Sequence, residues 1–196
     1  MGRSREYDED VVLAGAMGAF RRRGYAAVSI KELEQATGLK GGSIYHGYGD
    51  KAGLFDAAFA HYNRAVLRGR IAEHAPEAAG LGGVRKLFLT LLHEANGEAF
   101  GCLITNAAIE FGGSGMAHPG VAEGLRILSD TFADRLATAH GAGLLRSGVK
   151  PASASTKLLA LYQGILVLVR AGSDKGALAA MINDEFDNLE GKQDDA

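Results

Sequence analysis

Apolar residues recur every three or four positions along most of the chain, the spacing that places them on one face of a helix. The first such stretch covers residues 8–23, and its opening turn is acidic, where the helix dipole favours negative charge. Gly24 follows as a natural end. The apolar face of this expected helix consists of Val12, Ala16, Ala19 and Phe20.

Further helical patterns follow, separated by glycine-rich joints. A helix from Lys51 to about Arg70 precedes glycines at 80–83, which are interpreted as a joint. Ser153 or Ser155, and then Ser173, are the expected N-caps of the last two helices. The later patterns cover residues 84–96, 98–111, 119–140, 153–171 and 174–190. With 3 Pro, 28 Gly and many Ala and Leu, the chain is predicted to be all-α.

A helix, a turn and a second helix are predicted within residues 29–48. Ser29 and Glu32 form the S-x-x-E pattern of a capping box, in which each side chain bonds the other residue's backbone N–H. Gly38 ends this helix, and residues 39–47 form the next one.

The second of these helices carries short polar and aromatic side chains. Ile44 and Tyr48 are four residues apart and are expected to pack inward. Gly41 and Gly42 would allow a close approach to a partner helix or to a sugar-phosphate chain. The residues left on the other faces are Lys40, Ser43, Tyr45 and His46. Such side chains reach phosphates and base edges when a helix enters the major groove of DNA.

Charge is distributed unevenly, although the net formal charge is only -2. Between Phe20 and Arg70, nine lysine or arginine residues stand against four aspartate or glutamate residues; over 151–196, four basic residues stand against seven acidic ones. The basic excess favours a nucleic-acid partner for the N-terminal part. The apolar fraction of 47% and the charged fraction of 22% are typical of a folded globular protein.

Cysteine content and the N-terminal sequence favour a cytoplasmic protein. Cys102 is the single cysteine, so no intramolecular disulfide can form, and the N-terminus has no apolar signal core. The most apolar run, 158–169, includes Gln163 and Gly164 and is too short to cross a bilayer. No membrane contact is therefore expected.

The run SIKELEQATGLKGGSIYHGYGDKAGLF resembles the DNA-binding signature of the TetR/AcrR family of transcriptional regulators. In that signature a capped helix precedes a Gly turn, a Gly-Ser-(Leu/Ile)-Tyr core, an aromatic residue and a Lys that opens the next helix. The matching residues are Ser29, Gly38, Gly42, Ser43, Ile44, Tyr45, Tyr48 and Lys51. The resemblance implies an N-terminal three-helix helix-turn-helix DNA-binding domain plus a C-terminal helical ligand-binding and dimerisation domain. The expected boundaries are 1–50, with the helix-turn-helix at 29–48, a connecting helix at 51–80, and 81–196.

The resemblance also implies roles for individual residues. Ser29, Tyr45 and Lys51 would contact phosphates, and Lys40, Ser43 and His46 would reach base edges, with Gly42 between them. Two positions depart from the family pattern, because Gly41 and Gly47 replace a frequent lysine and a bulky residue.

Simpler interpretations stand beside these roles. Ser29 could serve only as a cap, His46 could be merely exposed, and Tyr48 is expected in the core. Lys51 opposes the helix dipole in the first turn of its helix, and a nearby phosphate would offset that cost.

The second half resembles the family's effector and dimer part more loosely, chiefly through GCLITNAAIEFG at residues 101–112. An unknown small-molecule effector would bind among residues 84–140. Its candidate contacts are Phe88, Leu92, Cys102, Asn106, Glu110, Phe111, Arg126 and Phe132. The apolar helix around residues 158–169 and the helix after it would form a homodimer, placing two recognition helices on palindromic double-stranded operator DNA.

The function expected from these features is that of a DNA-binding transcriptional regulator, a repressor that the effector releases from its operator. The alternative on the same fold is a redox or electrophile sensor acting through Cys102, or a soft metal held by Cys102 and His93. A buried structural cysteine is the simpler interpretation. No C-x-x-C or H-E-x-x-H spacing is present, so no metal or cofactor is expected.

Two other classes receive less support. A helical enzyme would use His46, His93 or His118 with Glu94 or Glu110, but no nucleophile elbow or phosphate loop accompanies them. A purely structural interaction protein gives no reason for the residues from Gly42 to Lys51.

Overall fold

The computed structural model describes residues 7–93, 100–112 and 118–191. Their regular elements are helices, which confirms the all-α prediction, and an isolated antiparallel bridge joins Leu145 to Glu190. The chain forms two compact units. Unit 1 comprises residues 1–67 and 102–122, and unit 2 comprises residues 68–101 and 123–196. The chain passes from unit 1 to unit 2 after Leu67, and not at the boundaries expected at residues 50 and 80.

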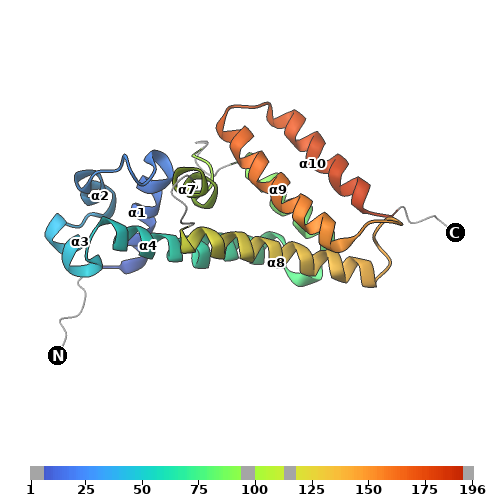
Figure 1. Ribbon diagram of the computed structural model, residues 1–196, viewed down its shortest axis with the longest axis horizontal. Helices are drawn as coiled ribbons and strands as arrows, with labels where there is room; N and C mark the ends of the chain where they lie inside the picture. The colour runs from blue at the N-terminus through green and yellow to red at the C-terminus, as the bar shows by residue number, and fades with distance from the viewer. Residues whose placement is uncertain (1–6, 94–99, 113–117, 192–196) are drawn as a thin grey trace. The chain divides into compact units, whose positions relative to one another are not determined.

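Unit 1 holds the N-terminal helices together with a later helix, α7, which packs on α1 (Figure 1). Its elements are α1 (Glu9–Arg23), α2 (Ile30–Thr37), α3 (Gly41–Tyr48), α4 (Lys51–His61), the π-helical η1 (Tyr62–Leu67), α7 (Leu103–Phe111) and the first turn of α8 (Pro119–Gly141). The first helix is confirmed, because Asp8 caps it and the four predicted apolar residues are buried. The helix expected from Lys51 to Arg70 is present, but it contains the π-helical segment.

The core of unit 1 is aromatic. The Phe55 ring lies 4.8 Å from that of Phe20 and 5.5 Å from that of Phe59, measured between centroids. Helices α1 and α2 cross closely, since a Cβ on Gly15 would lie 2.0 Å from the carbonyl oxygen of Ala36. A glycine inside an otherwise regular helix is thus required by packing.

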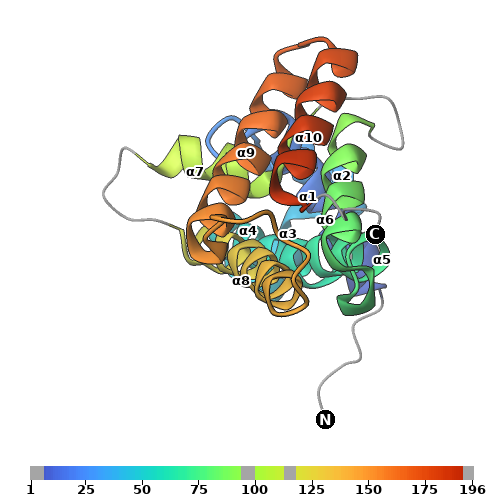
Figure 2. The same ribbon diagram turned by 90° about the vertical axis from the view of Figure 1, so that its right-hand side faces the viewer.

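Unit 2 is a helical bundle in which α9 and α10 lie side by side and α6 packs along α10 (Figure 2). Its elements are α5 (Arg68–His74), the 3₁₀ turn η2 (Glu77–Ala79), α6 (Gly80–Leu89), the 3₁₀ turn η3 (Thr90–Leu92), most of α8, α9 (Pro151–Arg170) and α10 (Lys175–Leu189). The fully buried Phe88 ring contacts Phe132, Tyr162 and Phe186 at centroid distances of 5.6, 5.2 and 5.3 Å.

The glycine-rich joint predicted at residues 80–83 is wrong, because α6 begins at Gly80 and includes these glycines. Gly83 is buried, and a Cβ there would lie 2.6 Å from the Cβ of Ala79. This position needs a small residue for packing.

Several predicted helix ends also shift. The helix expected over 98–111 begins at Leu103, and residues 94–99 lie outside the described part of the chain. Ser153 and Ser155 lie inside α9, whose N-cap is Lys150 with Pro151 in the first turn. Asp174 caps α10 in place of Ser173, and accepts hydrogen bonds from the N–H groups of Gly176 and Ala177.

Helix α9 has 20 residues, and by its length and composition alone it could cross a membrane. A core helix of a soluble protein passes the same test, so this is weak evidence of a membrane span. The residues of α9 that are buried within unit 2 are Ala154, Ser155, Leu158, Tyr162, Ile165, Leu166 and Val169.

Candidate nucleic-acid interface

Helix α2 begins at a complete capping box, as predicted. The Ser29 hydroxyl oxygen accepts the Glu32 N–H at 3.2 Å, and the Glu32 carboxylate accepts the N–H and O–H of Ser29 at 2.9 and 2.8 Å. The backbone bond from Ser29, then its hydroxyl, and then the charges of Arg23 and Lys51 hold the pKa of Glu32 below its ordinary value. Both donors of Ser29 are thus bonded to Glu32, so a phosphate contact would compete with the cap.

The turn between α2 and α3 is fixed by backbone geometry and by one carboxylate. Gly38 adopts a left-handed conformation with φ of 71°, the usual C-cap geometry. The N–H of Gly41, at the start of α3, donates to the Glu34 carboxylate of α2. The acidic side chain therefore satisfies a donor at the positive end of α3 and joins the two helices.

Helix α3 presents a polar and aromatic face outward. Ile44 is fully buried, whereas Tyr45 is 52% exposed and both Ser43 and His46 are exposed. Tyr48, expected in the core, is half-buried. Lys40 is exposed at the N-cap position. The prediction that Ile44 packs inward is therefore confirmed.

The glycines of α3 differ in their surroundings. A Cβ on Gly42 would meet no atom within 4 Å, so that side of α3 is open. A Cβ on Gly41 would lie 3.1 Å from Glu34, and one on Gly47 would lie 3.1 Å from the Tyr7 hydroxyl.

Lys51, at the start of α4, is held against the loop between α1 and α2. Its ammonium lies 4.7 Å from the centroid of the Tyr25 ring and donates to the carbonyl oxygen of Ala26 at 3.3 Å. Asp50 caps α4 by accepting the N–H of Gly53 at 2.8 Å. The half-buried Lys51 thus sits close enough to the capping box of α2 for its charge to act on Glu32.

Four of the predicted effector contacts lie in unit 1 on or next to α7. Cys102 is buried, and its sulfur lies 3.0 Å from the Tyr62 hydroxyl in η1. The Asn106 amide donates to the carbonyl of Arg21 at 3.1 Å, and the Phe111 ring packs at a tilt against that of Tyr25, with 5.5 Å between centroids. Glu110 accepts two backbone N–H bonds from the α1–α2 loop.

The other four predicted contacts lie in unit 2. Phe88, Leu92 and Phe132 are buried in its core. Arg126 is exposed and forms an ion pair of 3.0 Å with Asp130, one helical turn away on α8. The role of all eight residues as effector contacts stays a prediction.

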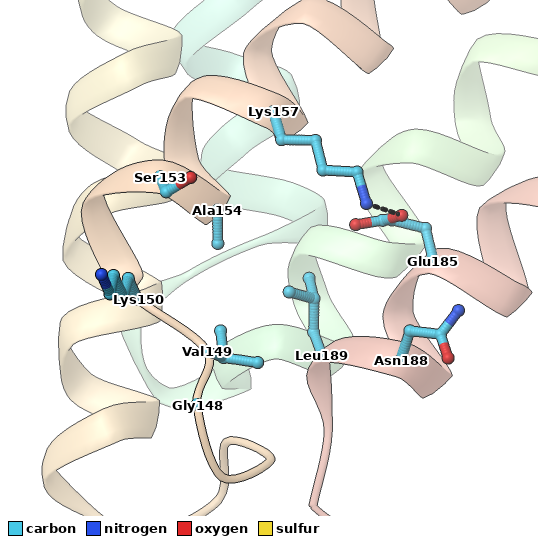
Figure 3. A pocket seen from close by; sticks show the side chains of 9 residues that line it. All are labelled: Gly148, Val149, Lys150, Ser153, Ala154, Lys157, Glu185, Asn188 and Leu189. Carbon is cyan, nitrogen blue, oxygen red and sulfur yellow. Dashed lines mark hydrogen bonds and ion pairs between the residues drawn. The ribbon is translucent and has the colours of Figure 1, made fainter.

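Two cavities are described within unit 2. One of about 290 Å³ lies between the start of α9 and the end of α10, where Lys157 and Glu185 form an ion pair of 2.7 Å (Figure 3). Another, of about 500 Å³, is lined mainly by small residues, including Ala79, Gly82 and Ala139. None of the eight predicted effector contacts lines either cavity.

Some residues that shape the interface escaped the sequence-based reasoning. A Cβ on Gly53 would lie 2.0 Å from the Tyr48 carbonyl, so this glycine lets α4 approach α3. The sequence feature that could have revealed this role is a glycine within a helical pattern. Glu34 gave no signal, and Glu110 was singled out only as an effector contact, because the partners of both are backbone N–H groups that only the fold brings near.

Among the residues that the structure describes, no group of three or more His, Cys, Asp or Glu side chains is arranged to hold a metal ion. The exposed His93 lies in unit 2 and the buried Cys102 in unit 1, so no common site is described for them.

Comparison with known proteins agrees with this arrangement. Residues 12–58 match the family described as "Bacterial regulatory proteins, tetR family". YezE, an HTH-type transcriptional regulator of Bacillus subtilis, is 31% identical over 116 residues, which are 56% of this chain and 58% of YezE. The repressor ComR of Escherichia coli is 39% identical over 61 residues, 31% of this chain and 29% of ComR. These matches thus span 58% of YezE and 29% of ComR, less than two thirds of each relative.

Solved structures extend the similarity to nearly the whole chain. A cysteine mutant of the TetR family regulator CifR has 25% identity and a TM-score of 0.76, with 94% of this chain and 98% of that chain covered. A regulatory protein TetR from Rhodobacter sphaeroides shares the fold at 18% identity and a TM-score of 0.78, covering 92% and 98%. Residues 80–184, more than half of the sequence, match the "Tetracyclin repressor-like, C-terminal domain". The chain belongs to the TetR family of bacterial regulatory proteins.

Proposed function

We propose that this protein is a DNA-binding transcriptional repressor that leaves its operator when a small molecule binds. The observation that carries the proposal is the outward face of α3, where Ser43, Tyr45 and His46 are exposed beside the open Gly42 while Ile44 anchors the helix. A helix with this division can enter the major groove and present short donors to base edges.

Local charge supports the same partner. Lys40 is exposed at the start of α3, and Lys51 lies where α4 begins. The related regulator CifR has been solved in complex with 26bp double-strand operator DNA. ComR is named a transcriptional repressor, and this supports the proposed sign of regulation.

A homodimer through α9 and α10 completes the proposal. Val167 and Leu168 on α9 are 44% and 41% exposed, although the opposite side of that helix is buried. Exposed aliphatic residues on a long helix favour a twofold bundle with a second copy. Two copies would then present two α3 helices to the halves of a palindrome.

The test is binding to duplexes from the DNA flanking the protein's own gene, measured by fluorescence anisotropy over about 50 to 200 mM salt. We expect one duplex to bind at least about a thousandfold more tightly than a shuffled duplex of the same composition, with affinity falling steeply as salt rises. Equal, salt-insensitive binding to both duplexes would overturn the proposal.

A second candidate signal is oxidation or alkylation of Cys102. Its contact with Tyr62 joins the start of α7 to η1, so an added group on the sulfur would break this contact. The thiol is buried, and a reagent would reach it only after local opening. Release from DNA by an electrophile in the wild type, but not in Cys102→Ser, is the expected result; an unchanged response in Cys102→Ser removes this candidate.

A further inference from the structure

A carboxylate from α7 holds the loop between α1 and α2. Glu110 accepts the N–H of Tyr25 at 2.8 Å and the N–H of Ala26 at 2.6 Å, so both carboxylate oxygens are used. The two partners are 85 and 84 residues away in sequence. Charge-assisted bonds of this length fix a loop more firmly than neutral ones.

The same two loop residues hold Lys51. The Ala26 carbonyl accepts the Lys51 ammonium, and the Tyr25 ring lies beneath it. Glu110 and Lys51 do not need to touch each other to be linked, because each is bonded to Ala26. The loop therefore connects α7 to the residue proposed to grip a DNA phosphate.

We propose that Glu110 is a positioning residue for DNA binding: it fixes the Tyr25–Ala26 loop and, through it, holds the Lys51 ammonium ready for a phosphate. This inference rests on the proposed function. It also gives α7 a route to the DNA-binding face, which runs through the backbone of the α1–α2 loop.

Other contacts keep α7 in register with this loop. The Asn106 amide bonds the Arg21 carbonyl in the last turn of α1. Gly24, at φ of 81°, leaves space for the carboxylate, because a Cβ there would lie 3.0 Å from a Glu110 oxygen. Phe111, the residue after Glu110, packs on the Tyr25 ring. A shift of α7 would therefore be transmitted to the loop.

Charge and positioning predict opposite effects for one substitution. Glu110→Gln removes a negative charge, so by electrostatics alone it should tighten binding to DNA. If Glu110 positions Lys51, the same change should weaken binding. Glu110→Asp keeps the charge but shortens the reach, and it should weaken binding as well. Glu123→Gln, an exposed residue on α8, makes the same charge change as a control.

The experiment measures anisotropy with the operator duplex and a shuffled duplex as salt rises. We expect Glu110→Gln and Glu110→Asp to lower the affinity for both duplexes about threefold to tenfold, and to reduce the salt slope by about 0.9, the value of one phosphate contact. In a Lys51→Ala background, Glu110→Gln should cause no further loss, because the group that it positions is gone. Glu123→Gln should bind DNA at least as tightly as the wild type, because it changes charge alone, and thermal unfolding should show that every variant is folded.

The outcomes separate this inference from the proposed function. Wild-type protein that shows no salt-sensitive binding to DNA overturns both. If the wild type binds DNA as expected, three results would overturn the inference alone. Glu110→Gln could bind as well as the wild type or better, Glu110→Asp could bind as the wild type does, or the loss caused by Glu110→Gln could be the same with and without Lys51. An unchanged salt slope, despite weaker binding, would assign Glu110 a merely structural role and also overturn it.

Discussion

The carbonyl oxygen of Ala36 lies 2.0 Å from the point where a Cβ on Gly15 would stand, so α1 and α2 cross without room for a methyl group. Gly18 lies one turn further along α1, and a Cβ there would meet nothing within 4 Å. The two glycines share one helix and differ only in what surrounds them.

We expect Gly15→Ala to lower the free energy of unfolding by about 1–3 kcal/mol, because the helices must separate. Gly18→Ala should raise it by about 0.5–1 kcal/mol, since alanine favours a helix over glycine. Urea unfolding followed by circular dichroism measures both. A similar change of stability in the two variants would contradict the close crossing.

The capping box predicts a dependence of stability on pH. The pKa of Glu32 is lowered in the folded protein, so its stabilising effect is present above the pKa of the unfolded chain and is lost as pH falls through the folded pKa. Between about pH 5 and pH 3, the wild type should lose more stability than Glu32→Gln. Ser29→Ala retains the backbone bond and should fall between them; parallel curves for all three proteins would count against the prediction.

His46 and Lys51 should affect DNA binding in different ways. His46 is exposed on α3, so His46→Ala should lose affinity at only one or two operator positions, by roughly tenfold. Lys51→Ala should weaken binding to every duplex alike and lower the salt slope by about 0.9. A set of operators with single base-pair changes distinguishes the two; a position-specific loss in Lys51→Ala would refute its phosphate role.

The proposed dimer predicts that charge on α9 separates the subunits. Leu168→Glu places a carboxylate on the exposed aliphatic face, and its burial without a partner would oppose association. Leu144→Glu is a matched control, because Leu144 is 48% exposed in the segment after α8. Sedimentation at micromolar concentration should show a monomer for the first variant and a dimer for the second. Dissociation of both variants, or of neither, would argue against this interface.

Local signals in the sequence were sufficient for much of unit 1. Gly24, Ser29 and Gly38 mark helix ends through contacts within a few residues, and the structure confirms all three. The inward position of Ile44 follows from spacing alone. Each of these features depends on short-range backbone geometry.

Other features depend on packing between distant segments. The glycines from Gly80 to Gly83 resemble a joint in sequence, but Gly83 in α6 is enclosed by Ala79, Ala75 and His74, which precede that helix. The contacts of Glu110 with the α1–α2 loop join residues more than eighty positions apart, and backbone N–H groups leave no mark in a sequence. The π-helical segment η1 had no sequence signal either.

The open position at Gly42 bears on how such a protein could acquire a new target. A side chain added there meets no neighbour, and it would replace glycine, a poor helix former, so folding should tolerate it. Gly41 and Gly47 on the same helix lack this freedom, because Glu34 and Tyr7 stand close to them. On the proposed function, a duplicated gene could therefore change its operator preference through one codon and keep its stability, which makes residue 42 the natural starting point for redesigning specificity.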